Sequence, residues 1–572
     1  MKKWVLATKQ TDFNKIAEQF KIDPVTAALI GNRGIEGTGN ISQYLYGDLA
    51  ELHDPAMMKD CARAVELLAD AIMQNKRMRI IGDYDIDGVM STYILQRGLR
   101  RVGARVDAAI PHRITDGYGI NVELIEAADN DGIEVIITCD NGIAAKEQIK
   151  VAKAKGMTVI VTDHHEVPYH EEAGLCQEIL PPADAIINPK QKDCNYPFKH
   201  LCGAAVAYKL IIEMYRYYRC PVDEHEEFLE YVAIATIGDV MDLVNENRIL
   251  VKEGLKRLQH TKNLGLRELI KVNDLKMDSL STYHIGFVLG PCLNASGRLD
   301  AAIRALELLN TTDELSAAKI AGDLKNLNDS RKEMTIKGVA EAIEAVEGTS
   351  LNEDRVLVVY LPDCHESLAG IIAGRLRERY YKPTLILTNS EDGVKGSGRS
   401  IEHYSMYDEL VKCQEFLAKF GGHPMAAGFS LKNSHEVSQF RERINQLCTL
   451  SPADLEEKIV IDVAMPLSYI KPALINELEL LQPFGKGNNK PVFAQKNIVI
   501  SDFRVFGKNK NVVKMKAKDE NGFVIDAIYF GEDEELLTYL EQGKGLSITY
   551  YPAINSYMGR ESLQIIISHY KV

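Results

Sequence analysis

Short apolar runs alternate with longer amphipathic stretches along the first half of the chain. Each run is rich in β-branched residues and ends in polar ones, and helical patterns such as 61–75 and 89–101 fill the intervals. Strands that alternate with helices build a parallel sheet with crossover helices. We therefore predict an α/β domain over 61–305, preceded by a mixed lead-in over 1–60 that shows no readable chemistry. The predicted strands are 78–81, 106–110, 133–139, 158–162 and 185–187.

One long helix is predicted over 312–347. Apolar side chains repeat there at helical spacing, Thr311 and Glu314 have the spacing of a capping box, and Gly348 supplies the stop signal. At about 1.5 Å per residue the helix measures about 54 Å, enough to join two bodies. We assign the connecting helix to 306–350.

The rest of the chain changes from a mixed to a strand-rich pattern. A second α/β zone over 351–455 opens with the strand-like run 355–361. The last zone, 456–572, carries strand patterns separated by turns such as Asn521-Gly522, which favours a small β-barrel or sandwich. The predicted fold class is multidomain α/β with this strand-rich domain at the C-terminal end. Because the last zone has its own strand pattern, we expect a cut near Ser451 to leave a folded remainder.

Composition narrows the class of protein. The 572 residues include 46% hydrophobic and 26% charged ones, the balance of an ordinary globular chain. No apolar run approaches the roughly 18–20 residues of a membrane helix, and the apolar stretch Trp4–Ala7 is too short for a signal peptide. The ten cysteines form no C-x-x-C pair, so we expect reduced thiols and a cytoplasmic location without membrane contact. A net charge of −14 argues against coating duplex nucleic acid but allows local basic patches.

Acidic and histidine side chains follow three of the predicted strands. In a parallel sheet the carboxyl ends of the strands share one crevice, so we expect these side chains to meet there. Clustered carboxylates repel one another unless cations neutralise them. Oxygen ligands with an imidazole suit Mg²⁺ or Mn²⁺, and two ions bridged by one carboxylate would activate a water nucleophile. The residues are Asp83, Asp85 and Asp87, then Asp140, then Asp163, His164 and His165, with Asp239 after a further apolar run.

Each cluster alone has a plainer interpretation. An acidic turn such as Asp83–Gly88 is more often a loop or a calcium site, and a histidine pair more often packs or lies on the surface. The EF-hand pattern fails, because the glutamate expected six residues after Gly88 is absent. The coincidence of three such clusters in one domain favours the metal site.

The motifs resemble a known family. Asp83–Gly88, Asp140–Gly142, Asp163–His165 and Asp239 resemble the four motifs of the DHH phosphoesterase superfamily. Within it, the chain is similar to the bacterial RecJ family of single-strand-specific exonucleases over nearly its whole length. The resemblance implies a DHH catalytic domain, a DHH-associated domain and an OB-fold domain. The stretches that carry the RecJ likeness are Pro111–Arg113, Gly117–Gly119, Asn294–Arg298, Gly396–Ser400, Gly421–Gly428 and Gln482–Asn488.

Residue roles follow from this resemblance. Many superfamily members have a histidine four positions before Asp85, where this chain has Ile81, so Asp83 is expected to take its place. Asp140 is the implied bridge between two Mn²⁺ or Mg²⁺ ions. Asp163 would orient its neighbours, and His165 would lie near the scissile phosphate or the water nucleophile. The implied metal ligands are Asp83, Asp85, Asp87, Asp140, His164 and Asp239, and the implied catalytic residues are His165, Asp163 and Asp140.

We expect nucleic-acid contacts from three parts of the chain, 61–305, 351–455 and 456–572. Arginine forks and glycine-flanked serines suit phosphate oxygens. The basic run Arg504–Lys518 contains no acid. Such a run is usually solvated surface, but in an OB-like barrel of an acidic protein it favours contact with a nucleic-acid backbone. The expected contact residues are Arg113, Tyr118, Asn294, Arg298, Ser397, Gly398, Arg399, His423, Arg504, Lys508, Lys514 and Lys516.

The resemblance implies a metal-dependent 5′-to-3′ exonuclease that hydrolyses single-stranded DNA to 5′-mononucleotides in DNA repair and recombination. Its implied partners are single-stranded DNA and, as further candidates, single-strand binding protein and a helicase. One alternative is a DHH phosphodiesterase for short oligonucleotides or cyclic dinucleotides, which would not need the OB-like tail. The other is a catalytically inactive scaffold that binds single strands, which loss of the acidic set would mark.

Overall fold

The computed structural model describes residues 2–8, 12–113, 116–172, 175–390, 393–507, 510–531, 534–557 and 559–572. Contacts divide the chain into two compact units. The larger unit comprises Trp4–Asn263, Asp274–Gly290 and Ile459–Val572, and the smaller comprises Met1–Lys3, Leu264–Asn273 and Pro291–Lys458. Among the described residues, no helix combines the length and apolarity needed to cross a membrane. The side chains of nine of the ten cysteines are described, and all nine have free thiols.

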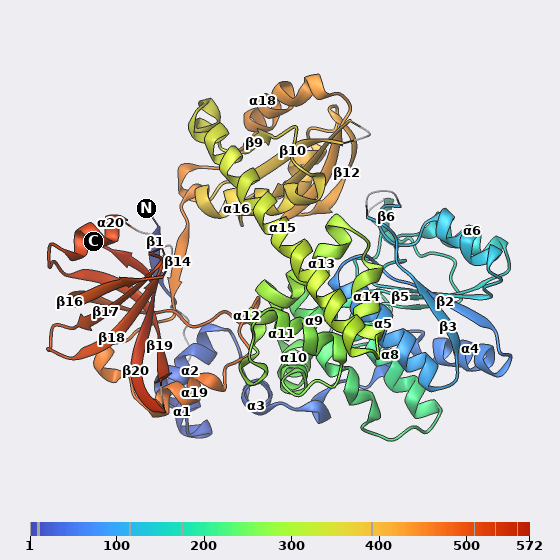
Figure 1. Ribbon diagram of the computed structural model, residues 1–572, viewed down its shortest axis with the longest axis horizontal. Helices are drawn as coiled ribbons and strands as arrows, with labels where there is room; N and C mark the ends of the chain where they lie inside the picture. The colour runs from blue at the N-terminus through green and yellow to red at the C-terminus, as the bar shows by residue number, and fades with distance from the viewer. Residues whose placement is uncertain are drawn as a thin grey trace. The chain divides into compact units, whose positions relative to one another are not determined.

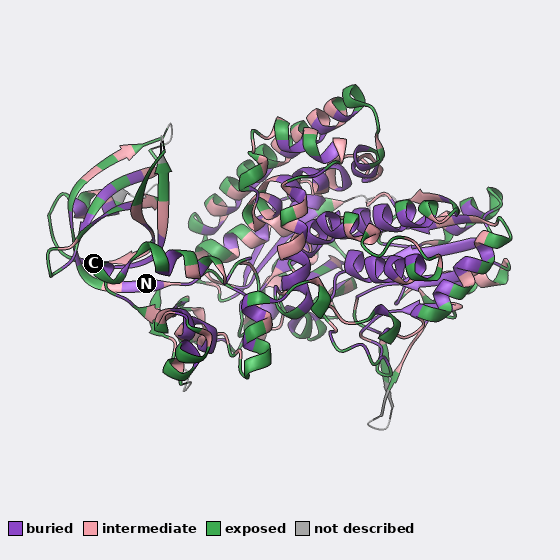
Figure 2. Ribbon diagram, turned by 90° about the horizontal axis from the view of Figure 1, so that it is seen from below, coloured by how far each residue is buried: buried purple, intermediate pink, exposed green. Residues whose placement is uncertain are grey.

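A five-stranded parallel sheet forms the centre of the larger unit, with strand order β3-β2-β4-β5-β8 (Figure 1). This confirms the predicted parallel sheet, and every predicted strand agrees with an observed one to within two residues. The strands are buried between helices, as Figure 2 shows in purple. The strands are β2 (Arg77–Ile81), β3 (Arg105–Ala109), β4 (Val135–Cys139), β5 (Thr158–Thr162) and β8 (Ala185–Ile187).

Helices cover both faces of this sheet. Apolar side chains of α6 and α7 pack on one face against Ile136, Val159 and Val161. Helices α4, α5 and α8 pack together on the other face. The hairpin β6 (Tyr169–Glu172) and β7 (Leu175–Glu178) follows β5. The helices are α4 (Cys61–Met73), α5 (Ile86–Arg101), α6 (Val122–Asn130), α7 (Lys146–Ala154), α8 (Gly203–Tyr217), α9 (Leu229–Gly238) and α10 (Asn245–Leu258).

A buried ion pair joins α8 to α10. Lys209 and Glu246 are both fully buried, and Nζ of the lysine lies 2.7 Å from Oε1 of the glutamate. The glutamate also accepts hydrogen bonds from the hydroxyl of Tyr196 (2.6 Å) and the backbone N–H of His53 (2.8 Å). Burial lowers the pKa of Lys209, and the charge of Glu246 opposes that shift. The pair thus ties the lead-in segment to two helices of the larger unit.

The C-terminal segment forms a closed barrel. Its sheet order is β15-β16-β17-β18-β20-β19, and pairing of β16 with β19 closes it, as the OB-like prediction required. Side chains alternate along β17, where Val513, Met515 and Ala517 point inward. The elements are β14 (Lys458–Ile461), β15 (Val463–Ala464), α19 (Pro472–Glu479), β16 (Phe493–Phe506), β17 (Val512–Lys518), β18 (Val524–Phe530), α20 (Glu534–Leu540), β19 (Leu546–Tyr557) and β20 (Arg560–Lys571).

The lead-in and the barrel share one hydrophobic core, so a cut near Ser451 would divide that core. Leu29, Ile30 and Leu45 of the lead-in belong to the same buried cluster as Phe493 and Ile548 of the barrel. The sequence pattern predicts the strands of the barrel, but it does not show which other segment of the chain packs against them. The lead-in consists of β1 (Lys3–Leu6), α1 (Phe13–Phe20), α2 (Pro24–Asn32) and α3 (Thr38–Tyr46).

A buried arginine anchors the same junction to α10. Arg248 is 3% exposed, and its guanidinium donates to the backbone oxygens of Tyr44, Leu480 and Leu481 at 2.7–3.0 Å. The guanidinium carbon also lies 4.2 Å from the centroid of the Tyr44 ring. Three carbonyls and an aromatic face therefore replace the water around this cation.

The smaller unit contains a mixed five-stranded sheet of order β12-β13-β11-β10-β9. The long helix, α15, runs Glu314–Glu347. Its cap differs from the prediction, because the side chain of Asp313, not Thr311, accepts from the N–H of Ser316. The other elements are α11 (Leu264–Val272), α13 (Gly290–Leu299), α14 (Ile303–Asn310), β9 (Leu357–Tyr360), α16 (Ala369–Tyr380), β10 (Thr384–Ser390), β11 (Gly393–Arg399), α17 (Met406–Val411), β12 (Leu417–His423), β13 (Ala426–Leu431) and α18 (Val437–Leu447).

The Lys209–Glu246 pair yields a stability prediction. Glu246→Gln should destabilise the protein by about 3 kcal/mol, because it leaves a buried ammonium without its counter-charge. Adding Lys209→Met should recover part of that loss, because the uncompensated charge is removed with it. Thermal and urea unfolding of the single and double variants measure the coupling. If the changes in unfolding free energy of the two single variants simply add up in the double variant, the two charges do not stabilise each other.

The shared core predicts the outcome of truncation. A chain that ends at Ser451 should expose the apolar side chains of α1–α3, which the barrel covers in the intact protein. It should bind a hydrophobic dye more strongly and be cut faster within 12–46 by a protease. A chain of 61–450, which lacks both halves of that core, should bind less dye. Equal dye binding by the two truncated chains would contradict the shared core.

Candidate metal centre

The structure brings the acidic and histidine motifs together at one edge of the parallel sheet. Asp83 follows β2, Asp140 follows β4, and Asp163–His165 follow β5. Asp239 comes from elsewhere, since it caps the C-terminal end of helix α9. The apolar run before it forms helix α9. Three groups have ligand atoms within 4.8 Å of one another: Asp140 with His164 and His165, Asp87 with His164 and Asp239, and Asp83 with Asp85 and Asp140.

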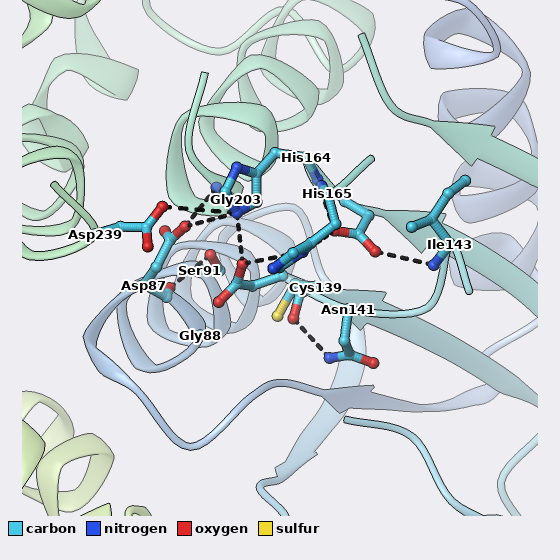
Figure 3. Close-up of polar contacts among 12 residues, drawn as sticks. Asp87, Gly88, Ser91, Cys139, Asn141, Ile143, His164, His165, Gly203 and Asp239 are labelled. Atoms are coloured by element: carbon cyan, nitrogen blue, oxygen red, sulfur yellow. Dashed lines mark hydrogen bonds and ion pairs between the residues drawn. The ribbon is translucent and has the colours of Figure 1, made fainter. Parts of the chain in front are cut away.

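His164 lies at the centre of the cluster. Its Nε2 is 3.1 Å from Oδ1 of Asp140, 3.6 Å from Oδ2 of Asp87 and 3.8 Å from Oδ2 of Asp239. Figure 3 shows its ring facing the carboxylates of Asp87 and Asp239. Burial lowers the pKa of His164, and the charge of His165 lowers it further. A neutral imidazole surrounded by carboxylate oxygens is the form in which histidine binds a metal.

The donor set fits divalent cations. Oδ1 of Asp83 and Oδ1 of Asp140 are buried and accept no hydrogen bond from any described residue. Burial raises the pKa of both carboxyl groups, and neighbouring carboxylates raise it further. Burial and the charge of Asp87 likewise raise the pKa of Asp239 to about 8. Oxygen atoms that lack a donor and repel one another require positive charge, and a hard cation supplies it.

Backbone groups hold two of the carboxylates in place. The side chain of Asp85 caps α5 by accepting from the N–H groups of Asp87 and Gly88, each at 3.0 Å. This cap explains why α5 begins at Ile86, three residues earlier than the predicted helix. Both oxygens of Asp87 accept from the first N–H groups of α8, those of Gly203 (2.6 Å) and Ala204 (2.7 Å). Nothing in the sequence marked the start of α8 as part of the site.

The turn after β4 needs an unusual backbone. Asp140 has φ 59° and Gly142 has φ 113°. A Cβ atom at Gly142 would lie 2.4 Å from Oγ1 of Thr138, so only glycine fits there. The Asn141 amide donates to the carbonyls of Ile81 and Cys139 at 3.1 and 2.8 Å. Its oxygen accepts from the N–H of Ile120 at 3.1 Å, which holds the 117–120 loop beside the cluster.

Asp163 orients the second histidine. Its Oδ1 lies 2.8 Å from Nδ1 of His165 and accepts from the backbone N–H of that residue at 3.0 Å. Burial alone would lower the pKa of His165, but the hydrogen bond to Asp163 raises it to about 9. The hydroxyl of Tyr118 donates to the carbonyl of Asp140 at 3.0 Å and lies 3.1 Å from Nε2 of His165. His165 therefore presents Nε2 toward the partly open side of the cluster.

Two cations of the larger unit lie near the cluster. The guanidinium carbon of Arg113 is 4.8 Å from the centroid of the Tyr84 ring. Lys486, which the sequence interpretation did not assign a role, lies in the loop between α19 and β16. Its Nζ is 3.4 Å from Oδ1 of Asp242, and its carbonyl accepts from the N–H of Leu243 at 2.8 Å. Its charge opposes the rise in the pKa of Asp239, a proximity that only the fold reveals.

The remaining predicted contact residues lie outside this cluster. In the smaller unit, Nη1 of Arg298 donates to the carbonyl of Ser367 at 2.8 Å. Oδ1 of Asn294 is buried without a hydrogen-bond partner among the described residues, and His423 is exposed at the end of β12. Ser397 and Arg399 are neighbours on β11, on either side of buried Gly398.

Basic residues of the barrel lie on two adjacent strands, β16 and β17. Lys514 and Lys516 are exposed on the outer side of β17, and Arg504 is exposed opposite Lys514 on β16. Lys516 pairs with Asp526 at 2.8 Å, so its charge is partly compensated. Lys508 lies outside the described residues.

Three stretches of the chain match known protein families. Residues 77–236 match the N-terminal domain of the DHH family, and residues 353–450 match the DHHA1 domain. Residues 461–569 match the RecJ OB domain. The three matches account for the parallel sheet, the mixed sheet of the smaller unit and the barrel.

Relatives extend the likeness to the whole chain. A single-stranded-DNA-specific exonuclease RecJ of Bacillus subtilis is 36% identical over 98% of this chain and 69% of its own length. The protein of that name from Salmonella typhimurium is 33% identical over 96% of this chain and 95% of its own. A crystal structure of RecJ from Thermus thermophilus in complex with Mn²⁺ aligns with a TM-score of 0.83 at 25% identity, covering 100% of this chain and 79% of that one. The chain belongs to the RecJ family of the DHH superfamily.

Proposed function

We propose that this protein is a metal-dependent exonuclease that hydrolyses single-stranded DNA from its 5′ end and releases 5′-mononucleotides. The buried cluster of carboxylates around His164 carries this proposal, because its unpartnered oxygens need divalent cations. The family supplies the substrate, since the relatives are named single-stranded-DNA-specific exonucleases. Relatives crystallised with Mn²⁺ support Mn²⁺ or Mg²⁺ as the cation.

The cluster offers ligands for two ions, with Asp140 shared between the groups that contain His164 and Asp83. When bound, the ions would supply positive charge to the scissile phosphate and lower the pKa of water. The proposed ligands are Asp83, Asp85, Asp87, Asp140, His164 and Asp239. Ile81 is buried in the hydrophobic core and offers no ligand atom, whereas Asp83 is buried beside Asp85 and Asp140. This supports the proposal that Asp83 takes the place of the histidine that many superfamily members have at the position of Ile81.

His165 and its neighbours are the residues proposed to stabilise the charge that develops on the scissile phosphate. Asp163 fixes the ring of His165 through Nδ1, so Nε2 keeps one direction. A protonated His165 can donate from Nε2 to a phosphate oxygen as charge develops there. Tyr118 supports this arrangement, because its hydroxyl contacts both Asp140 and His165.

Ser397 and Arg399 are the proposed site for the 5′ phosphate. Both side chains approach Gly370 near the start of helix α16, within 3 Å of where a Cβ atom would stand. A guanidinium and a hydroxyl that lie side by side form a suitable environment for a phosphate.

The domain set favours a long strand over a small ligand. A phosphodiesterase for cyclic dinucleotides would have no use for the barrel that matches the RecJ OB domain. An inactive scaffold would not retain all six proposed ligands. Family membership is also the basis for proposing single-strand binding protein and a helicase as partners, a role in repair and recombination, and a cytoplasmic location.

Asp140→Asn tests the metal centre. The rate of single-stranded-DNA hydrolysis should fall by more than about 100-fold. Mutation of a residue that only supports a metal ligand costs up to about 100-fold, so a larger loss indicates a ligand itself. Without metal the variant should melt at the same or a higher temperature, because one of several mutually repelling carboxylates is neutralised. Added Mn²⁺ should raise the melting temperature of the wild type more than that of the variant. Asp129→Asn, at an exposed carboxylate paired with Lys155, is the control. Wild-type turnover in Asp140→Asn would refute the assignment.

Arg399→Ala tests the 5′-phosphate site. The wild type should degrade a 5′-phosphorylated strand faster than a 5′-hydroxyl strand. The variant should lose most of that preference, because a charge-assisted bond to phosphate contributes about 1.5–3 kcal/mol, or roughly 10-fold or more in rate. Arg375→Ala, an exposed arginine of α16 that pairs with Glu378, serves as the control. A full preference in Arg399→Ala would place 5′-end recognition elsewhere.

A further inference from the structure

A small pocket of the larger unit takes no part in the proposed reaction. Its volume is about 280 Å³, and it lies between the end of α2 with helix α3, the start of α10, and the loop between α19 and β16. Helices α3 and α10 also contact each other directly. The pocket is therefore placed where segments distant along the chain meet. The lining residues used below are Arg33, Glu36, Asn40, Gln43, Asn245 and Arg248.

Two guanidinium groups line the pocket without a counter-charge. That of Arg248 is almost fully buried and donates to three backbone carbonyls. Arg33 is half-buried, and its Nε donates to Oδ1 of Asn488 at 3.0 Å. Its two Nη atoms donate to the carbonyls of Leu29 and Asn489 at 2.9 and 2.7 Å. Within the described part of the chain, neither arginine forms an ion pair with a carboxylate, so neutral oxygens surround both cations.

Repulsion between the two arginines adds to the cost of burial. Burial lowers the pKa of Arg248 to about 10, and the charge of Arg33 contributes to that shift. Burial raises the pKa of Asp462 and the charge of Arg33 opposes that rise, but this carboxylate already accepts from the N–H of Val492 at 2.9 Å. The lining, all of it described, contains one carboxylate, that of Glu36, which is exposed. A bound anion would therefore neutralise charge that the chain itself leaves uncompensated.

The pocket offers donors for an anion of limited size. The hydrogen bonds to described residues use three of the five N–H groups of each guanidinium, which leaves two on each. Asn40, Gln43 and Asn245 add side-chain amides to the lining. Guanidinium forks match the oxygens of a phosphate. The volume lies just below the roughly 300–1,000 Å³ of ligand pockets, which suits a phosphate or one nucleotide rather than a longer strand.

We infer that this pocket binds a small phosphate-bearing anion, either inorganic phosphate or a 5′-mononucleotide, at the guanidinium groups of Arg33 and Arg248. The two ligands share the phosphate group, which supplies the missing counter-charge. The pocket uses none of the residues proposed for the metal centre or for the 5′ phosphate of the strand, and its occupancy does not depend on hydrolysis. The bound anion stabilises the junction of the lead-in with α10, because it binds the folded chain only.

Calorimetric titration and thermal unfolding test the pocket. The probes are inorganic phosphate, thymidine 5′-monophosphate and, as the uncharged counterpart, thymidine. The parent protein is the full chain with Arg399→Ala, without divalent metal, so that neither the proposed 5′-phosphate site nor bound ions hold the probes. Both phosphates should bind and raise the melting temperature, and thymidine should do neither. Tighter binding of thymidine 5′-monophosphate supports a mononucleotide as the ligand, and equal binding supports inorganic phosphate.

Two substitutions in the pocket make the test specific. Arg33→Gln should weaken phosphate binding about 10-fold or more, the loss expected for one charge-assisted hydrogen bond. Gln43→Glu keeps the size of the side chain but adds a carboxylate to the lining. It should raise the melting temperature without phosphate and abolish the further rise that phosphate causes. Combined with Arg33→Gln, the same carboxylate should raise the melting temperature less, because it then faces one guanidinium instead of two.

A matched arginine outside the pocket is the control. Arg63 is exposed on α4 beside Glu66, and Arg63→Gln should leave phosphate binding unchanged. Absence of phosphate binding by the parent protein would overturn the inference, as would full binding in both Arg33→Gln and Gln43→Glu. It would also be overturned if Arg33→Gln kept its affinity for the two phosphates but lost affinity for single-stranded DNA, since the pocket would then contact the strand.

Discussion

Mutual repulsion among buried carboxylates is the constraint on which the site depends. Asp83, Asp87 and Asp140 are almost fully buried, and their charges can coexist there only if fixed dipoles and cations surround them. The protein supplies the dipoles from its backbone. The first turn of α8 binds both oxygens of Asp87, and Asp85 is held by the first turn of α5. Among the described residues, the hydrogen bonds leave Oδ1 of Asp83 and Oδ1 of Asp140 unmatched.

Close packing sets the precision of this arrangement. A Cβ atom at Gly203 would lie 2.8 Å from Cβ of Asp140, so the start of α8 can approach the turn after β4 only because that residue is glycine. Gly142 permits the turn itself, and Asn141 pins the 117–120 loop above it. Metal ligands must be positioned to within a fraction of an ångström, and these close van der Waals contacts provide that accuracy.

The two ends of the chain are part of the same machinery. The lead-in helices complete the core of the barrel, and Arg248 and Lys486 bind this assembly to the segment that follows Asp239. Buried contacts, and not a free linker, therefore join the barrel to the segment that follows Asp239.

The sequence by itself determined the parallel sheet, its strands, and the acidic and histidine residues that meet at the edge of that sheet. These depend on short-range patterns: β-branched runs, helical periodicity, and polar residues where strands end. The pattern of the last zone predicted strands, and the resemblance to a known family added that they close into a barrel. Only the tertiary structure decided that Asp239 reaches the cluster from a helix, that the lead-in covers the barrel, and that Lys486 lies beside Asp242. Each of these joins residues distant along the chain through burial and hydrogen bonding. Such contacts leave no periodic pattern in the sequence, because they depend on how the surfaces that meet fit together.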